Sequence, residues 1–205
     1  GNLDIIAKEE SFSGQAYFDD NPNYDINDTS VTLPYTSARI RTKGKFSFKY
    51  GRVDVRAQLP AGLGMWPAFW MLPEEWVYGG WPLSGEIDIM EAANLNTDRA
   101  FPILGTLQYG STWPNYVPKG GDYESSSRYH EEFHLYTIEW EADEMRWFVD
   151  GHHYHTQRSE GWYNYIWQGQ DEGFGVANPR APFDQEFHLI INAAVGGGLP
   201  GAPDT

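Results

Sequence analysis

Three carboxylic acids, Glu86, Asp88 and Glu91, fall within six consecutive positions of the stretch GEIDIMEA. Large apolar side chains separate them in the alternating pattern of a β-strand that has one apolar face. Like charges this close repel one another, so a purely structural strand gains nothing from carrying them. Two carboxyl groups held in different protonation states, one ionised and one protonated, are the groups that cleave a glycosidic bond. This strand is therefore the candidate catalytic centre.

An unbroken strand would not place all three acids together. Side chains alternate between the two faces of a strand, so Glu91, five positions after Glu86, would point away from Glu86 and Asp88. One extra residue at Ile89-Met90, a β-bulge, returns Glu91 to the side of the other two. We therefore predict a bulge in this strand and, with it, three carboxyl groups on one face.

Tryptophans precede the acidic strand. Trp66 and Trp70 lie in the segment WPAFWMLP, and Trp81 leads directly into the acids. Alternating acids alone most often form a solvated face, but indole rings beside paired carboxyls suit sugars, whose C–H faces stack on aromatic planes. Trp66 and Trp81 are the candidates for stacking a sugar. Trp70 could serve either the core or the binding site, and Trp76 is expected in a loop.

The motif GEIDIMEA preceded by WPAFWMLP resembles glycoside hydrolase family 16, in particular its laminarinases, which are endo-β-1,3-glucanases. Further segments match the family pattern in the expected order: GRVDVRAQLP at 51–60, FHLYTIEW at 133–140, WFVDG at 147–151 and INAAVGG at 191–197. The resemblance implies retaining endo-hydrolysis of a laminarin-type β-1,3-glucan. It makes Glu86 the nucleophile and Glu91 the acid and base, with Asp88 holding one glutamate in its working protonation state.

The same resemblance implies further sugar-binding residues. The polar face of the strand expected at 51–59 carries Arg56 and corresponds to the concave, sugar-binding face of the family. His134 is expected near the acid/base carboxyl, and Asn192 lies in the matching segment near the C-terminus. Gln108 stands where the family usually carries histidine, so no titrating group is expected at that position.

Many short alternating segments between turns rich in Gly, Pro and Asn predict an all-β sandwich. The strands we expect include residues 1–12, 37–42, 45–50, 51–59, 145–149 and 152–156. The last two are joined by an Asp150-Gly151 turn, and residues 111–130 indicate a long surface loop. The resemblance implies a β-jelly-roll of two curved antiparallel sheets with an open concave substrate cleft.

We expect one catalytic domain over residues 1–205. The first and last strand segments usual in the family are missing from the sequence, so the chain is expected to be a fragment or to cover the exposed edges with other elements. A structural calcium ion in many relatives takes ligands from those segments, so it is expected to be weakened or missing. The chemistry needs no cofactor. His153 and His155 project together without an acidic or thiol ligand at suitable spacing, so no metal site is predicted.

Charge and composition limit the partners. A net charge of −15 repels nucleic acid and anionic lipid, whereas a neutral polysaccharide fits. The chain has no cysteine and no run of about 18 apolar residues that could span a membrane. We therefore expect a monomer that binds β-glucan and neither nucleic acid nor membrane. An extracellular location is implied by the resemblance alone, since the sequence shows no signal-peptide pattern.

Two other functions stay open. One is hydrolysis of a related polymer, first a mixed-linkage β-1,3-1,4-glucan and then agarose or carrageenan. The other is non-catalytic β-glucan binding on the same scaffold, although such binders have usually lost one or both glutamates, which this chain keeps. The sequence does not reveal linkage or chain-length preference.

Overall fold

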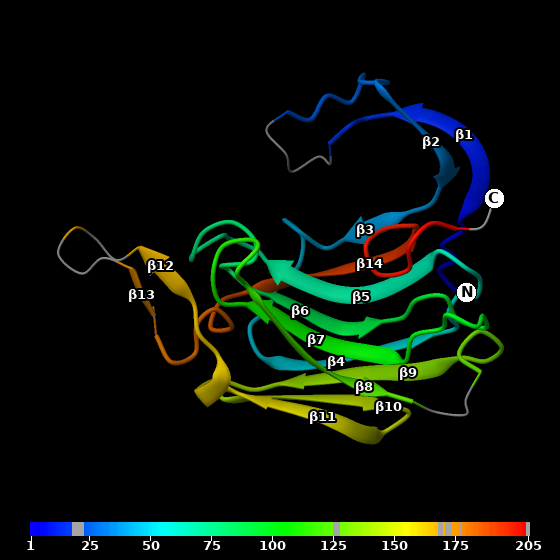
Figure 1. Cartoon of the computed structure of the whole chain (residues 1–205). Coiled ribbons are helices and arrows are strands. Elements are labelled where there is room, and N and C mark those ends of the chain that lie inside the picture. The colour runs from blue at the N-terminus through cyan, green and yellow to red at the C-terminus, as the bar shows by residue number, and fades with distance from the viewer. Residues whose placement is uncertain (18–22, 125–127, 168–169, 171–173, 177, 204–205) are drawn as a thin grey trace.

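Two antiparallel β-sheets packed face to face form the body of the molecule, as predicted (Figure 1). The computed structural model describes residues 1–17, 23–124, 128–167, 170, 174–176 and 178–203. The larger sheet has six strands in the order β3-β14-β5-β6-β7-β8. Their bounds are Arg39–Arg41 (β3), Phe187–Val195 (β14), Met65–Pro73 (β5), Glu86–Glu91 (β6), Ile103–Tyr109 (β7) and Val117–Tyr123 (β8).

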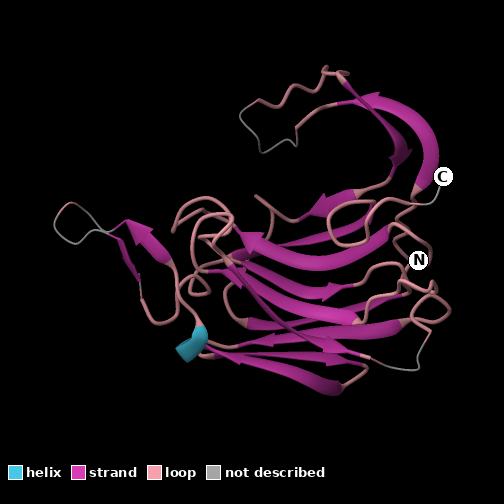
Figure 2. Cartoon of the chain, in the orientation of Figure 1, coloured by secondary structure: helices cyan, strands magenta, loops and turns pink. Residues whose placement is uncertain are grey.

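The smaller sheet has four strands in the order β11-β10-β9-β4. Their bounds are His152–Arg158 (β11), Glu144–Val149 (β10), His134–Trp140 (β9) and Gly51–Ala57 (β4). Two hairpins stand apart from this sandwich: β1 (Lys8–Gly14) with β2 (Val31–Thr36), and β12 (Tyr165–Trp167) with β13 (Phe174–Val176). Within the described residues the helical content is one 3₁₀ turn, η1 (Ser159–Gly161), which is cyan in Figure 2.

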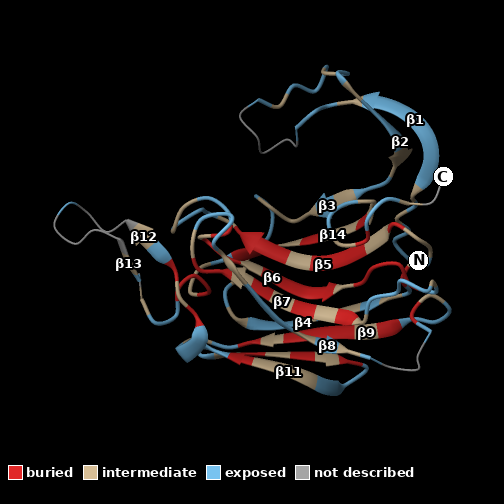
Figure 3. Cartoon of the chain, viewed as in Figure 1, coloured by how far each residue is buried: buried red, intermediate tan, exposed pale blue. Residues whose placement is uncertain are grey.

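The core lies between the two sheets, where alternate side chains of each strand meet. Ile87 and Leu107 from the larger sheet and Ile138 and Trp147 from the smaller one have no exposed surface. The buried stretches of β5, β6, β7 and β9 are red in Figure 3. Because inward residues alternate with outward ones, this core fixes which side chains of β6 face away from it.

The hairpin predicted from Asp-Gly is present between β10 and β11. Asp150 and Gly151 both have positive φ, 49° and 79°, which is the backbone a tight two-residue hairpin turn requires. The side chain of Asp150 also accepts a hydrogen bond from the N–H of Leu135 at 2.8 Å. The turn therefore ties β9 to the hairpin that follows it.

Three of the predicted elements were wrong. The first strand begins only at Lys8, and residues 45–50 form no strand apart from an isolated bridge between Phe48 and Phe187. The expected loop 111–130 contains β8, whose Gly and Pro content is typical of loops. The glycines of β8 let this strand lie close to β7, since a Cβ on Gly120 would lie 2.5 Å from the carbonyl oxygen of Gly105.

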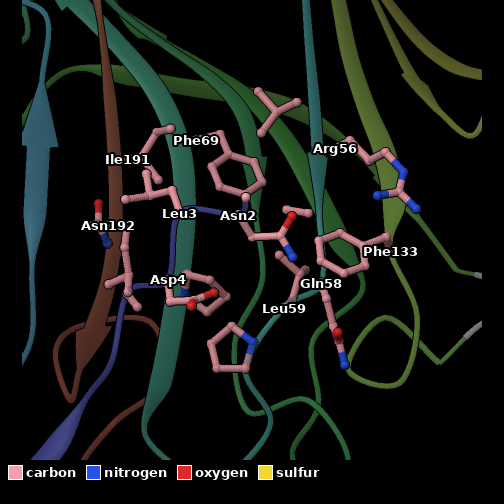
Figure 4. Close-up of a pocket in the computed structure, with 17 residues that line it drawn as sticks. Asn2, Leu3, Asp4, Arg56, Gln58, Leu59, Phe69, Phe133, Ile191 and Asn192 are labelled. Atoms are coloured by element: carbon pink, nitrogen blue, oxygen red, sulfur yellow. The ribbon is translucent and has the colours of Figure 1, made fainter.

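A pocket of about 560 Å³ opens on the core side of the sandwich, between β4 and β14 (Figure 4). Phe69 and Ile191 point into it, and the N-terminal residues Asn2 and Leu3 lie within it. Arg56 and Asn192, two of the predicted sugar-binding residues, also line this pocket (Figure 4), whereas the acids of β6 do not. It is therefore a gap at the edge of the core, partly filled by the N-terminal segment, and a place distinct from the candidate catalytic centre.

Candidate catalytic site

The acidic strand β6 contains the predicted bulge. Asp88 opposes Thr106 on β7 and Glu91 opposes Leu104, so three steps along β6 correspond to two steps along β7. The pairing with β5 shifts at the same place and passes over Ile89. One surplus residue thus sits in β6 between Asp88 and Glu91, and the prediction is confirmed.

The bulge brings the acids to one face of the larger sheet. Ile87 points into the core, so Glu86 and Asp88 on either side of it point out of the opposite face. Two observations place Glu91 with them. Trp66 donates a hydrogen bond to Oε1 of Glu91 at 3.1 Å, and the charge of Glu91 raises the pKa of both Glu86 and Asp88. Three carboxyl groups therefore share the outward face.

The core supports the bulge from beneath. Trp147 of β10 is fully buried, and its Nε1 donates to the carbonyl oxygen of Asp88 at 2.9 Å. This bond satisfies a backbone group next to the place where the ladder is interrupted. Gly105 on β7 leaves room for the indole, since a Cβ there would press on Trp147 and lie 2.5 Å from the hydroxyl oxygen of Tyr154.

Replacing Gly105 should therefore destabilise the protein. In Gly105→Ala the added methyl group meets the buried indole, and overpacking of this kind costs about 1–3 kcal/mol of unfolding free energy. We expect a melting temperature lower by about 3–10 °C. Scanning calorimetry measures it, with Gly80→Ala as control because a Cβ there meets nothing within 4 Å. Equal melting temperatures for the two variants would contradict the role given to Gly105.

Hydrogen bonds hold Glu86 and Asp88 in place. Trp81 Nε1 donates to Oε2 of Glu86 at 2.6 Å, and Gln108 Nε2 donates to its Oε1 at 2.9 Å. The same Gln108 nitrogen lies 3.2 Å from Oδ2 of Asp88. Asp88 is in turn hydrogen-bonded to Glu86. Glu86 thus receives several donors, which is the environment that favours an ionised carboxylate.

Burial raises the pKa of every carboxyl group in this cluster. It brings that of Glu86 to about 7, against the lowering effect of hydrogen bonds from Asp88 and Trp81. Asp88 is enclosed, and burial followed by the charges of Glu86 and Glu91 lifts its pKa well above the usual range. Burial also raises the pKa of Glu91, against a single hydrogen bond from Trp66. The raised pKa of Asp88 favours its protonated form, which can donate a hydrogen bond to Glu86.

These raised pKa values make folding depend on pH. Because the folded protein binds the proton of Glu86 more tightly than the unfolded chain does, the stabilisation is complete below pH 4.5 and disappears as the pH rises through about 7. The pKa of Asp88 is also raised in the folded protein, so its contribution to stability likewise decreases as the pH rises. In Asp88→Asn we expect the unfolding free energy to fall less than in the wild type as the pH rises from 4.5 to 8, because the proton bound by Asp88 in the folded protein is removed.

Calorimetry of wild type and Asp88→Asn across that pH range checks this expectation. Comparing the two cancels the contribution of groups elsewhere, such as His188, whose pKa burial lowers to about 4. Parallel stability curves for the two proteins would show that Asp88 does not carry the proton in question.

The predicted tryptophans and Asn192 lie on the same face as the acids. Trp70 opposes Asp88 in the ladder, and its Nε1 donates to Oδ1 of Asn192 at 2.8 Å. Asn192 Nδ2 donates to the carbonyl oxygen of Trp66 at 3.3 Å. Trp81 keeps 38% of its surface exposed beside Glu86. Their contact with a sugar stays a prediction.

The placement expected for Arg56 was wrong. Arg56 lies on β4 in the smaller sheet, opposite Leu135 of β9, and not in the sheet that holds the acids. Its guanidinium stacks 4.5 Å from the ring centre of Phe133. Because its neighbours Val55 and Ala57 pack against the core, Arg56 faces outward on the far side of the sandwich.

The placement expected for His134 was also wrong. It is buried at the start of β9, in the smaller sheet, where its Nδ1 lies 2.7 Å from Oδ2 of Asp150. Its ring packs edge to face on Tyr129 at 5.0 Å. The larger sheet separates it from the outward acids, so His134 holds the β10–β11 turn and does not neighbour Glu91.

An aromatic cluster that was not predicted from the sequence lies beside Trp81. The ring of Tyr116 lies 5.1 Å from that of Trp81, and the ring of Trp113, which is 64% exposed, lies 6.2 Å away. Arg39 of β3 also reaches this face, with its guanidinium 4.7 Å from the ring centre of Trp70. Trp81, Trp113 and Tyr116 lie in loops before β6 and β8, and Arg39 lies on β3, so the fold brings together residues that are distant in the sequence.

Within the described residues, no three His, Cys, Asp or Glu side chains are grouped so as to hold a metal ion. The weakening or loss of a structural calcium site stays a prediction. In this described part of the chain, no helical segment has the length and hydrophobicity of a membrane span.

Fold and site together define a two-sheet jelly roll that carries its acids on a bulged inner strand. Residues 9–170 match the family described as Glycosyl hydrolases family 16. The chain belongs to this family.

Named proteins similar to this chain include enzymes that cleave β-1,3-glucan and a protein that binds it. The chain is 40% identical over 203 residues to glucan endo-1,3-beta-glucosidase A1 of Niallia circulans, covering 98% of this chain and 26% of that protein. It is 40% identical over 181 residues to a beta-1,3-glucan-binding protein of Penaeus monodon, covering 82% of this chain and 49% of the relative. The catalytic domain of an endo-1,3-beta-glucanase (laminarinase) from Thermotoga petrophila RKU-1 matches with a TM-score of 0.72 at 34% identity, over 98% of this chain and 69% of that one. The chain thus spans half or less of the two full-length relatives.

Proposed function

We propose that this protein cleaves β-1,3-glucan of the laminarin type within the polymer, with retention of the anomeric configuration. The observation that carries the proposal is the bulge in β6, which puts Glu86, Asp88 and Glu91 on one face beside Trp66 and Trp81. The names of the relatives from Niallia circulans and Thermotoga petrophila support the substrate class.

In the first step the Glu86 carboxylate attacks the anomeric carbon and the glycosidic C–O bond breaks. Glu91 gives its proton to the departing sugar oxygen, so the leaving chain departs as a neutral alcohol. The product is a glycosyl ester on Glu86 with inverted configuration. Burial raises the pKa of both glutamates, so the assignment rests on their donors. Glu86 receives hydrogen bonds from Trp81 and Gln108, which favour its carboxylate. Glu91 receives a side-chain hydrogen bond from Trp66 and is suited to carry the proton.

In the second step Glu91, now ionised, removes a proton from water, and the oxygen of that water attacks the same anomeric carbon. The ester bond breaks, and Glu86 leaves as a carboxylate. Two inversions give net retention. The raised pKa of Asp88 favours its protonated form, and the hydrogen bond between Asp88 and Glu86 stabilises the carboxylate that leaves.

The partner we propose is a neutral β-glucan chain bound by a monomer. The net charge of −15 suits a substrate without charge of its own. We also propose an extracellular location, because a long polysaccharide cannot cross a membrane to reach an enzyme inside the cell.

Side-by-side assays of reducing ends released from laminarin, barley glucan, agarose and carrageenan test the substrate. We expect the highest rate on laminarin, with oligosaccharides of intermediate length appearing first. NMR of the fresh products should show the β-anomer before mutarotation. Faster turnover of barley glucan would assign the chain to mixed-linkage hydrolysis instead, and an initial α-anomer would exclude retention.

Non-catalytic β-glucan binding is the second candidate, because a protein named for β-1,3-glucan binding is 40% identical to this chain. Co-sedimentation with insoluble β-1,3-glucan detects binding, and the reducing-end assay detects cleavage. Binding without any release of reducing ends would favour this candidate. The complete set of acids and their hydrogen bonds favours the hydrolase.

A further inference from the structure

We propose that Gln108 is a positioning residue that holds the nucleophile Glu86 and its neighbour Asp88 in register through a side-chain amide that does not titrate. The role rests on the proposed function of Glu86. Gln108 directly opposes Glu86 in the antiparallel ladder of β6 and β7. Residues opposite one another in such a pair share a face, so the amide rises beside both acids.

The hydrogen bonds identify the amide as a bridge. Nε2 of Gln108 lies 2.9 Å from Oε1 of Glu86 and 3.2 Å from Oδ2 of Asp88. An amide nitrogen carries two hydrogens, so one atom can serve both carboxyl groups. Trp81 serves Oε2, the remaining oxygen of Glu86. Both oxygens of the proposed nucleophile therefore have a donor, and Gln108 links the nucleophile to Asp88 through its amide nitrogen.

The amide differs from the histidine that resemblance to the family leads one to expect here. A neutral imidazole has a single N–H, so it can donate to one carboxyl group only, and its charge changes between about pH 5 and 8. The amide donates two hydrogen bonds at any pH. The acids that face it are Glu86 and Asp88 of β6, with Glu91 beyond the bulge, and β8 places Pro118 opposite it.

Removing the amide should move the pH profile as well as the rate. In Gln108→Leu, Glu86 loses a donor that favours its ionised form, so its pKa rises further. We expect kcat/KM on laminarin to fall about 10- to 100-fold at pH 6 and the acidic limb of the profile to move to higher pH. Gln108→His should return that limb toward lower pH, because a charged imidazole beside Glu86 stabilises the carboxylate.

Gln58→Leu is the matched control, since Gln58 is exposed and donates to the carbonyl of His130, away from the acids. It should leave rate and profile unchanged. If Gln108→Leu does not fold, Gln108→Asn takes its place, because the shorter side chain cannot reach both acids. An acidic limb that stays in place while the rate falls equally at every pH would overturn the proposal.

A wild type that releases no sugar from any glucan would reject the proposed hydrolysis but not the bridge. The pH at which stability falls reports ionisation of the same acids without turnover. Calorimetry should show this fall at higher pH in Gln108→Leu than in the wild type. Coinciding curves would reject the bridge independently of activity.

Discussion

Glu86→Gln is expected to lower the rate of laminarin hydrolysis by at least about 10³-fold. The amide has the size of the carboxyl group and its oxygen can still accept hydrogen bonds, so the folded structure should persist. It cannot attack the anomeric carbon, and no glycosyl ester forms. Initial rates of reducing-end release measure the loss. Calorimetric titration with laminarin oligosaccharides should show that binding is retained.

Two comparisons make this result specific to the nucleophile. Glu131→Gln alters an exposed glutamate paired with Arg128 and should leave the rate unchanged. In Glu86→Ala, added azide can occupy the space of the carboxylate and attack the anomeric carbon once, giving an α-glycosyl azide. Activity of Glu86→Gln above a tenth of wild type, or a β-glycosyl azide from Glu86→Ala, would contradict the assignment of Glu86 as nucleophile.

The acidic centre could be predicted because its signal is local. The spacing of Glu86 and Glu91 is odd, and an odd spacing places two residues on one face only if the strand contains an extra residue. The Asp150-Gly151 turn could likewise be predicted from the sequence, since few residue pairs adopt two successive positive φ angles. In both places the physics of a few neighbouring residues determines the structure.

The positions that could not be predicted depend on how strands pair. Alternation in 51–59 correctly separated Arg56 from the core side chains, but it does not say which sheet the strand joins. β4 pairs with β9 in the sheet without the acids, so the outward face of Arg56 is remote from them. His134 shares that sheet. The role proposed for Gln108 likewise depends on strand pairing, because Gln108 on β7 lies opposite Glu86 on the neighbouring strand β6.

Glu91→Gln is expected to have the second large effect, and its size should depend on the leaving group. In laminarin the leaving group is a sugar hydroxyl, which departs poorly as an alkoxide unless it receives a proton. Hydrolysis of laminarin should therefore slow by about 10²–10⁴-fold. A dinitrophenyl β-laminaribioside releases dinitrophenolate, a stable anion that can leave without receiving a proton. Its first step should therefore be almost unaffected, which stopped-flow absorbance of released dinitrophenol measures.

The second step should reveal the other role of Glu91. Without a base the attacking water is not activated, so the glycosyl ester on Glu86 should accumulate and dinitrophenol should appear in a burst equal to the enzyme concentration. Azide needs no base and should restore turnover, giving a β-glycosyl azide by a second inversion. If both substrates slow equally and no burst appears, Glu91 is not the acid and base.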